Sequence, residues 1–278
     1  MRAHPESQAG RALVRIVPAL LAILLLVPAA LAVAGSGDNP NAPELLPDLD
    51  QEMPTQLMIT RAGTRSHPRW RLGFRSAVRN IGDGPLIIDG SRRRSVTKMD
   101  ADQAIVREGA AREKVPGVGH LRYVYAPDHQ HWHLLGFDRY ELRRPGARHA
   151  LVKDRKSGFC LGDRYQVTTR VLPAATQDPV YTSRCGLDRP DLLGVREGIS
   201  VGWGDDYVAN VEGQYLPLKG LRNGRYVLVH RVNANHRLRE IRYDNNAASD
   251  LLRLRWRHGR PSLRILAVCP TTARCTRG

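Results

Sequence analysis

The sequence predicts an all-β domain of the β-sandwich class, stapled by disulfides and preceded by a targeting segment. Short apolar runs of strand length recur along the chain, and turn-forming Gly, Pro, Asn and Asp residues separate them. After the first 34 residues, no apolar pattern has the length and period of an ordinary helix. The four cysteines in that same part of the chain can form two disulfide bonds.

Residues 1–34 are predicted to form a secretory signal peptide. Three arginines flank an apolar run over residues 16–34, which ends in Ala32-Val33-Ala34, a small-x-small pattern typical of signal cleavage. An uncleaved membrane anchor is the alternative, because the run is nearly long enough to span a bilayer. Both interpretations place the rest of the chain outside the cytoplasm, secreted or on the exterior of the cell envelope.

The exported part begins with residues 35–55, which are rich in Gly, Pro, Asn and Asp and are predicted to form a linker or an irregular arm. Residues 56–278 are long enough to bury one sizeable core. Within them, residues 71–80 and 86–88 are predicted strands that a Gly-Asp-Gly-Pro turn connects. The charged stretch over residues 90–120 has no clear period and favours a loop or a short helix.

The second half of the chain carries further strand and turn patterns. Residues 137–142 alternate and are predicted to continue the preceding strand's sheet around a bend at Gly136. Residues 164–200 have few apolar runs and indicate a long loop fastened by Cys185. Three later strands are predicted at residues 215–218, 225–232 and 251–256. An Asn-Gly turn precedes the second of these strands, and an Asp-Asn-Asn turn precedes the third.

Alternating histidines occupy the strand that precedes Gly136. In a strand, His129, His131 and His133 point to one face, with Gln130 and Trp132 on the other. Side chains two positions apart lie roughly 6–7 Å apart along a strand, a gap that imidazoles can span. Three neutral imidazoles suit zinc and copper(II) equally well. A cluster of surface histidines without a metal is the alternative.

The cysteines indicate disulfides because an even number lies in a chain predicted to reach an oxidising compartment. Four cysteines allow three pairings. We favour the nearest neighbours in sequence, Cys160 with Cys185 and Cys269 with Cys275. Four buried free thiols are the alternative.

The chain is strongly basic, with a net charge of +16. Residues 1–34 hold three arginines and one glutamate, so the remainder keeps a net charge of +14. A basic exported protein is expected to adhere to anionic polymers such as cell-wall phosphates. The charge is spread along the sequence and no aromatic-interleaved motif accompanies it, so no specific nucleic-acid partner is predicted.

The histidine run, the Lys-Ser-Gly-Phe-Cys-Leu segment and the Asp-Asp-Tyr segment together resemble the lysyl oxidase family of copper amine oxidases. Further segments match in the same order, and the resemblance covers roughly residues 55–270. It departs from the animal members in its fewer cysteines, in a longer stretch between the second and third segments, and in a Trp-Gly pair where those members carry Cys-Tyr. The matching segments are 72–82, 129–133, 156–161, 198–202, 205–207, 224–228 and 243–246.

The resemblance implies copper held by the three histidines and an organic cofactor, lysine tyrosylquinone, made from the enzyme's own side chains. The matching positions are Lys156 and Tyr207. A tyrosine ring beside Cu(II) and O₂ can be oxidised to an ortho-quinone, to which a neutral lysine amine can add. Lys153 is an alternative for the cross-link and Tyr215 for the quinone. The general base is left open by the sequence, and Asp205 is one candidate catalytic base because it lies near Tyr207.

Asp206 is the alternative base, since it also adjoins the matched tyrosine. The expected reaction is oxidative deamination of primary amines, including lysine side chains of proteins, to aldehydes. O₂ would be the electron acceptor, and hydrogen peroxide and ammonia the other products. A non-catalytic exported copper-binding β-sandwich is the alternative function, and a wall-adhesion module that uses the basic surface is a third.

Overall fold

The computed structural model describes residues 39, 41–126, 129–153, 158–209 and 211–276. The predicted signal peptide and Lys156 lie outside these residues. The described part is almost entirely β, which confirms the predicted fold class, and its single helical element is the 3₁₀ turn η1 (Val211–Gly213). None of the helical structure in it is long and apolar enough to cross a bilayer.

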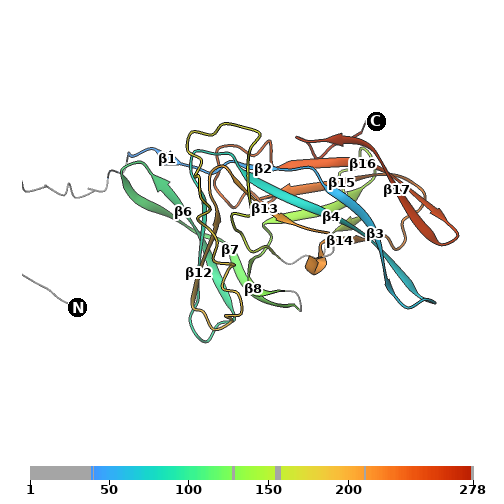
Figure 1. Cartoon of the computed structure of the whole chain (residues 1–278), viewed down its shortest axis with the longest axis horizontal. Coiled ribbons are helices and arrows are strands. Elements are labelled where there is room, and N and C mark those ends of the chain that lie inside the picture. Colours follow the sequence, from blue (N-terminus) through green and yellow to red (C-terminus); the bar gives the residue numbers. More distant parts are fainter. Residues whose placement is uncertain (1–38, 40, 127–128, 154–157, 210, 277–278) are drawn as a thin grey trace, which may run out of the picture. The chain divides into compact units, whose positions relative to one another are not determined.

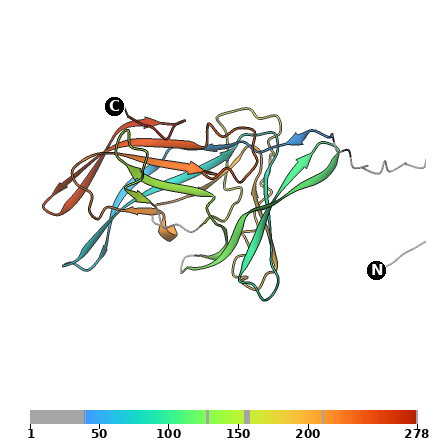
Figure 2. The ribbon, with the colours of Figure 1, turned by 180° about the vertical axis from the view of Figure 1, so that it is seen from behind.

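Three antiparallel sheets make up the domain, and Figures 1 and 2 show the strands of the first running across those of the other two. The first sheet has the order β12-β5-β6-β7-β8, with β1 paired to β6. Its strands are β1 (Glu44–Leu45), β5 (Leu86–Ser91), β6 (Lys98–Arg107), β7 (Ala110–Ala126), β8 (His129–Leu134) and β12 (Gly194–Ile199).

The loop or short helix predicted for residues 90–120 is wrong, because most of that stretch forms the β6–β7 hairpin. The inward side chains of β6 include Met99, Ala101, Gln103 and Ile105, which are all buried. Small and polar members of this set hide the period-two pattern in the sequence. Gln103 fits inside because its side-chain amide bonds both the N–H and the C=O of Arg239.

The second sheet has the order β10-β9-β15-β16-β17. Gly136, with φ of 74°, turns the chain after β8, so β9 enters this sheet and does not continue the sheet of the histidine strand as predicted. The strands are β9 (Asp138–Arg143), β10 (Val152–Lys153), β15 (Gly224–Val232), β16 (Ala247–Arg257) and β17 (Arg260–Cys269).

The third sheet is built around β4 (Pro68–Asn80), which carries strands along both edges. The stretch expected to be a linker or an irregular arm contributes β1, β2 and the first residue of β3, and Leu49 in it is fully buried, so it is part of the folded domain. The partners of β4 are β2 (Leu49–Gln51), β3 (Thr55–Gly63), β13 (Trp203–Tyr207), β14 (Tyr215–Pro217) and, through β13, β11 (Tyr165–Gln166).

The second and third sheets share a core of aromatic side chains. Phe74 of β4 lies 5.1 Å from the ring centroid of Tyr140 in β9 and 5.0 Å from that of His230 in β15. Tyr140 in turn meets Phe159 at 6.1 Å. Burying such rings removes large apolar areas from water and gives the domain its main driving force.

Side-chain hydrogen bonds hold the turn after β4. The amide of Asn80 accepts from the N–H groups of Asp48 and Gly82 and donates to the carbonyls of Gly84 and Ile199. A Cβ at Gly82 would lie 2.4 Å from the Asp48 nitrogen, so only glycine fits there. The Asn-Ile-Gly sequence therefore fastens β4 to β12 and to the N-terminal arm.

Both predicted disulfides are confirmed, Cys160 with Cys185 and Cys269 with Cys275, and the described residues contain no free cysteine. The first disulfide fastens the long loop predicted over residues 164–200. Residues 167–193 of that stretch are irregular, while its ends form β11 and β12.

Candidate functional site

The histidine run forms strand β8, as the sequence predicts. Trp132 points into the core, where its ring meets Tyr123 at 5.5 Å and its indole N–H donates to the carbonyl of Arg189. On the opposite face, the ring centroids of His131 and His133 are 4.7 Å apart. Imidazole nitrogens bind zinc at about 2.0–2.1 Å, so two rings this close can share one ion. The side chain of His129 is not among those described.

A short segment lies directly against this strand. Phe159 pairs with Leu134, the residue after His133, through two backbone hydrogen bonds of 2.8 and 3.1 Å. The approach requires glycine at the preceding position, because a Cβ on Gly158 would lie 2.6 Å from the Leu134 carbonyl oxygen and 3.0 Å from the His133 Cβ. The Gly-Phe-Cys segment is therefore packed on the backbone that carries the histidines.

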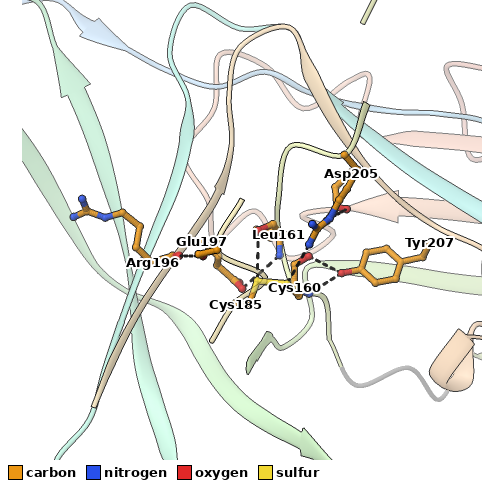
Figure 3. Close-up of a disulfide and its surroundings, with 9 residues drawn as sticks. Cys160, Leu161, Cys185, Arg196, Glu197, Asp205 and Tyr207 are labelled. Carbon is orange, nitrogen blue, oxygen red and sulfur yellow. Dashed lines mark hydrogen bonds and ion pairs between the residues drawn. A yellow bond between two sulfur atoms is a disulfide. The ribbon is translucent and has the colours of Figure 1, made fainter. Parts of the chain in front are cut away.

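Tyr207 lies on the other side of the same segment, at the end of β13. Its hydroxyl donates to the Cys160 carbonyl at 2.6 Å and accepts from the Cys160 N–H at 2.7 Å (Figure 3). Its ring meets Phe159 edge-on at 4.8 Å. Burial, followed by the nearby carboxyls of Asp205 and Glu197, raises the pKa of the Tyr207 hydroxyl well above its usual range.

Two buried carboxyls accompany Tyr207. Asp205 shares its face of β13, and the Arg164 guanidinium lies 3.6 Å from an Asp205 oxygen. Glu197, on β12, is reached by the Leu161 N–H at 3.4 Å. Burial raises the pKa of both groups well above the usual range for a carboxyl, and Arg164 opposes the rise at Asp205. Figure 3 shows both carboxyls and the Tyr207 hydroxyl around the Cys160–Leu161 backbone.

Tyr215 and Lys153, the alternatives to Tyr207 and Lys156 for the cofactor, lie in different surroundings from Tyr207. Tyr215 pairs with Gly73 on β4, whereas Tyr207 pairs with Ser76, so the odd spacing places the two tyrosines on opposite faces of the sheet. Arg71 covers the Tyr215 ring at 4.0 Å. Lys153 is exposed at the edge strand β10.

Asp206 points away from Asp205 and forms an ion pair with Arg75 at 2.7 Å. Its neighbour Asp205 therefore has the better placement beside Tyr207. Both carboxylates lie close to Tyr207 in the sequence, and the alternation of β13 places their side chains on opposite faces of the sheet.

Sequence reasoning missed Glu197, Gly158 and Arg164. Glu197 lies in a run that reads as an ordinary charged segment, Arg-Glu-Gly-Ile, and its burial follows from its pairing position opposite Ile88 on β5. Its carboxyl lies within 4.8 Å of the sulfurs of Cys160 and Cys185. Those sulfurs are joined in a disulfide and offer no thiolate, so this group is not a metal site.

Comparison with known proteins gives a consistent assignment. A model of the lysyl oxidase family matches residues 92–258, more than half of the chain. The protein-lysine 6-oxidase of Rattus norvegicus is 25% identical over 131 residues, which cover 47% of this chain and 28% of the rat protein. That of Sus scrofa is 25% identical over 131 residues and 46% of its length. The chain thus spans less than half of these relatives, and it belongs to the lysyl oxidase family.

Proposed function

We propose that this chain is an exported copper- and quinone-dependent amine oxidase. It converts primary amines, including lysine side chains of proteins, to aldehydes, consuming O₂ and water and releasing ammonia and hydrogen peroxide. The observation that carries the proposal is the Phe159–Cys160 segment. One side of it is hydrogen-bonded to the histidine strand at Leu134, and the other side binds the Tyr207 hydroxyl.

His129, His131 and His133 would hold the copper ion. The close approach of the two described imidazoles supports this role, and neutral imidazoles are good ligands for copper. Burial of Trp132 on the opposite face of β8 determines which face of the strand the histidines occupy. Copper and a quinone supply the two-electron oxidation of the amine and the return of the electrons to O₂.

Tyr207 and Lys156 would supply the quinone cofactor, lysine tyrosylquinone. Lys156 lies three residues before Phe159, so the covalent chain limits the distance between their Cα atoms to about 11 Å. Phe159 contacts the Tyr207 ring. This reach supports a cross-link between the two side chains. Lys156 must lose its proton to act as a nucleophile, which a site poor in water favours.

Asp205 would accept the proton that leaves the carbon next to the substrate nitrogen. A carboxyl whose pKa is raised is a stronger base once ionised, which suits proton abstraction near neutral pH. Glu197 is a second buried carboxyl beside the same backbone and would hold a proton close to the Tyr207 oxygen.

A non-catalytic copper-binding β-sandwich is the second candidate function. The two hydrogen bonds between the Tyr207 hydroxyl and Cys160 favour it, because they give the tyrosine a structural role that requires no oxidation. The two functions predict the same copper content and differ in whether hydrogen peroxide is formed.

Copper content and peroxide release test the proposal together. The copper-loaded, aerated protein should release hydrogen peroxide with a small primary amine, and Lys156→Arg should abolish the release because a guanidinium stays protonated. Replacing His131 or His133 by Ala should remove most of the copper, whereas His67→Ala, at an exposed hairpin, should retain it. Full copper in both ligand variants would contradict the metal site. Copper without peroxide would favour the second candidate.

A further inference from the structure

The outer face of the second sheet is rich in arginine. The inner side chains of β9, β15 and β16, including Tyr140, Tyr226 and Leu252, are buried in the core. Because side chains alternate along a strand, the intervening positions lie on the opposite face of the sheet, where Val227, Val229 and Leu251 are covered in a second apolar cluster and arginines surround them. We call this surface the arginine face. Its strand residues include Arg139, Arg143, Arg225, Arg231, Arg253, Arg255, Arg257, Arg260 and Arg264.

The strand register places these cations directly opposite one another. Arg253 pairs with Arg225 on one side and with Arg264 on the other, and all three are exposed. Arg231 pairs with Arg139 in the same way. Like charges at directly opposed positions destabilise a sheet. The arrangement therefore leaves repulsion that a bound anion would relieve.

A hollow of about 530 Å³ lies at one end of this face. Arginines from β9, β15, the loop after β9 and the C-terminal segment line it together with small residues. None of the described side chains that line it is acidic. The arginines are Arg143, Arg144, Arg148, Arg231 and Arg274.

Counter-charge on the arginine face is scarce. Glu141 is the single acidic side chain among its described strand positions, and Arg143 already binds it. Burial, followed by repulsion from Arg143, lowers the pKa of Arg231, although an arginine stays protonated in water at any ordinary pH. The hollow therefore holds more positive charge than its own carboxylates neutralise.

A smaller hollow of about 190 Å³ continues the basic surface across β16 and β17. Arg253, Arg255 and Arg264 line it, with Ser262 and Leu263, and no acidic side chain of the described part of the chain lies there either. Two arginine-lined hollows on one sheet face provide separate positions for successive anionic groups of one molecule.

We propose that the arginine face is a docking surface for an extended polymer that carries phosphate groups. Guanidinium forks bind phosphate oxygens in a bidentate manner, and a chain of phosphates can occupy several arginines in succession. Among the described residues, the outward strand positions include no aromatic side chain on which bases could stack, which favours a phosphate polymer over single-stranded nucleic acid. The surface would attach the exported enzyme to anionic material.

The docking surface is separate from the proposed oxidase site. Tyr207 packs against the core on the inner side of the second sheet, through Phe159 and Tyr140, whereas the arginine face is the outer side of that sheet. A bound polymer would therefore leave the amine site open. Cationic lysine side chains are repelled by the arginine face, so this surface does not itself recruit the proposed substrates.

Binding of end-labelled inorganic polyphosphate to the full chain, followed by fluorescence anisotropy, tests the proposal. The variant Arg225→Gln/Arg253→Gln/Arg264→Gln removes three exposed charges from the arginine face. The control Arg93→Gln/Arg94→Gln/Arg112→Gln removes three exposed charges from the first sheet and its loop. The first variant should weaken polyphosphate binding about 10-fold. The slope of log affinity against log salt concentration should decrease in magnitude by about two to three, because fewer counterions are released on binding.

The control variant should change the affinity less than about twofold, because its charges are not in the docking surface. Equal weakening by both variants would show a general effect of net charge and overturn the proposal, as would the absence of binding. An oligonucleotide with the same number of phosphates should bind no tighter than polyphosphate. If the oligonucleotide binds more tightly than polyphosphate, and the triple substitution in the arginine face does not weaken this binding, the proposal would also be overturned. Peroxide release from a small amine should be the same in all three proteins, so the test is independent of the oxidase activity.

Discussion

Replacing Tyr207 by Phe should cost more stability than the loss of one hydroxyl ordinarily does. The hydroxyl is both donor and acceptor to the backbone of Cys160, at 2.6 and 2.7 Å. Phe keeps the edge-on contact with Phe159 but leaves the Cys160 N–H and C=O without this partner. Each unsatisfied buried group costs about 1–3 kcal/mol, so the two groups together should cost about 2–6 kcal/mol.

Thermal unfolding of the copper-free protein, followed by circular dichroism, measures this loss without involving the cofactor. For a domain of this size the loss corresponds to a decrease in Tm of about 4–24 °C. Tyr226→Phe is the control, because Tyr226 is buried and its hydroxyl makes one hydrogen bond, to the Arg222 carbonyl. It should cost about 1 kcal/mol. Equal changes in the two variants would refute the inference that Tyr207 fastens the Phe159–Cys160 segment.

Three further outcomes follow from the packing. Gly158→Ala should destabilise the protein by about 1–3 kcal/mol and lower its copper content, because the new Cβ meets the Leu134 carbonyl; Gly119→Ala, whose Cβ would make ordinary contacts, should change neither in a combined unfolding and metal assay. Reducing Cys160–Cys185, which spans 25 residues, should remove about 3–4 kcal/mol in denaturant titrations, and an unchanged midpoint would contradict this. Burial raises the pKa of Asp250 to about 7, so the folded protein keeps a proton that the unfolded chain releases. Stability should therefore fall from about pH 4 to pH 7, and Asp250→Asn should remove this component; parallel pH profiles for the two proteins would disprove it.

Strands with a clear apolar pattern were predictable from the sequence. Residues 71–80 lie within β4 and residues 225–232 within β15, because continuous apolar positions and adjoining turns mark both. β6 was missed because Gln103 occupies an inward position that only its distant partner Arg239 makes acceptable. Such a partner is a property of the fold, which a local pattern cannot reveal.

The candidate site was predictable where one strand carries its residues. Alternation alone placed His131 and His133 on one face, and the structure confirms that the rings lie together. Gly158 and Glu197 could not be identified in this way. Their importance depends on contacts between segments, with Leu134 for the glycine and with the Leu161 backbone for the glutamate.

The identity of the quinone residues is the central claim, and peptide mass analysis tests it most directly. Copper-loaded, aerated protein should be treated with phenylhydrazine, digested with a protease and compared with protein kept free of copper. The account predicts one peptide that joins Lys156 to Tyr207, present only after copper and O₂ have been supplied and lost in Lys156→Arg. Separate and unmodified Lys156 and Tyr207 peptides from the copper-loaded protein would contradict it.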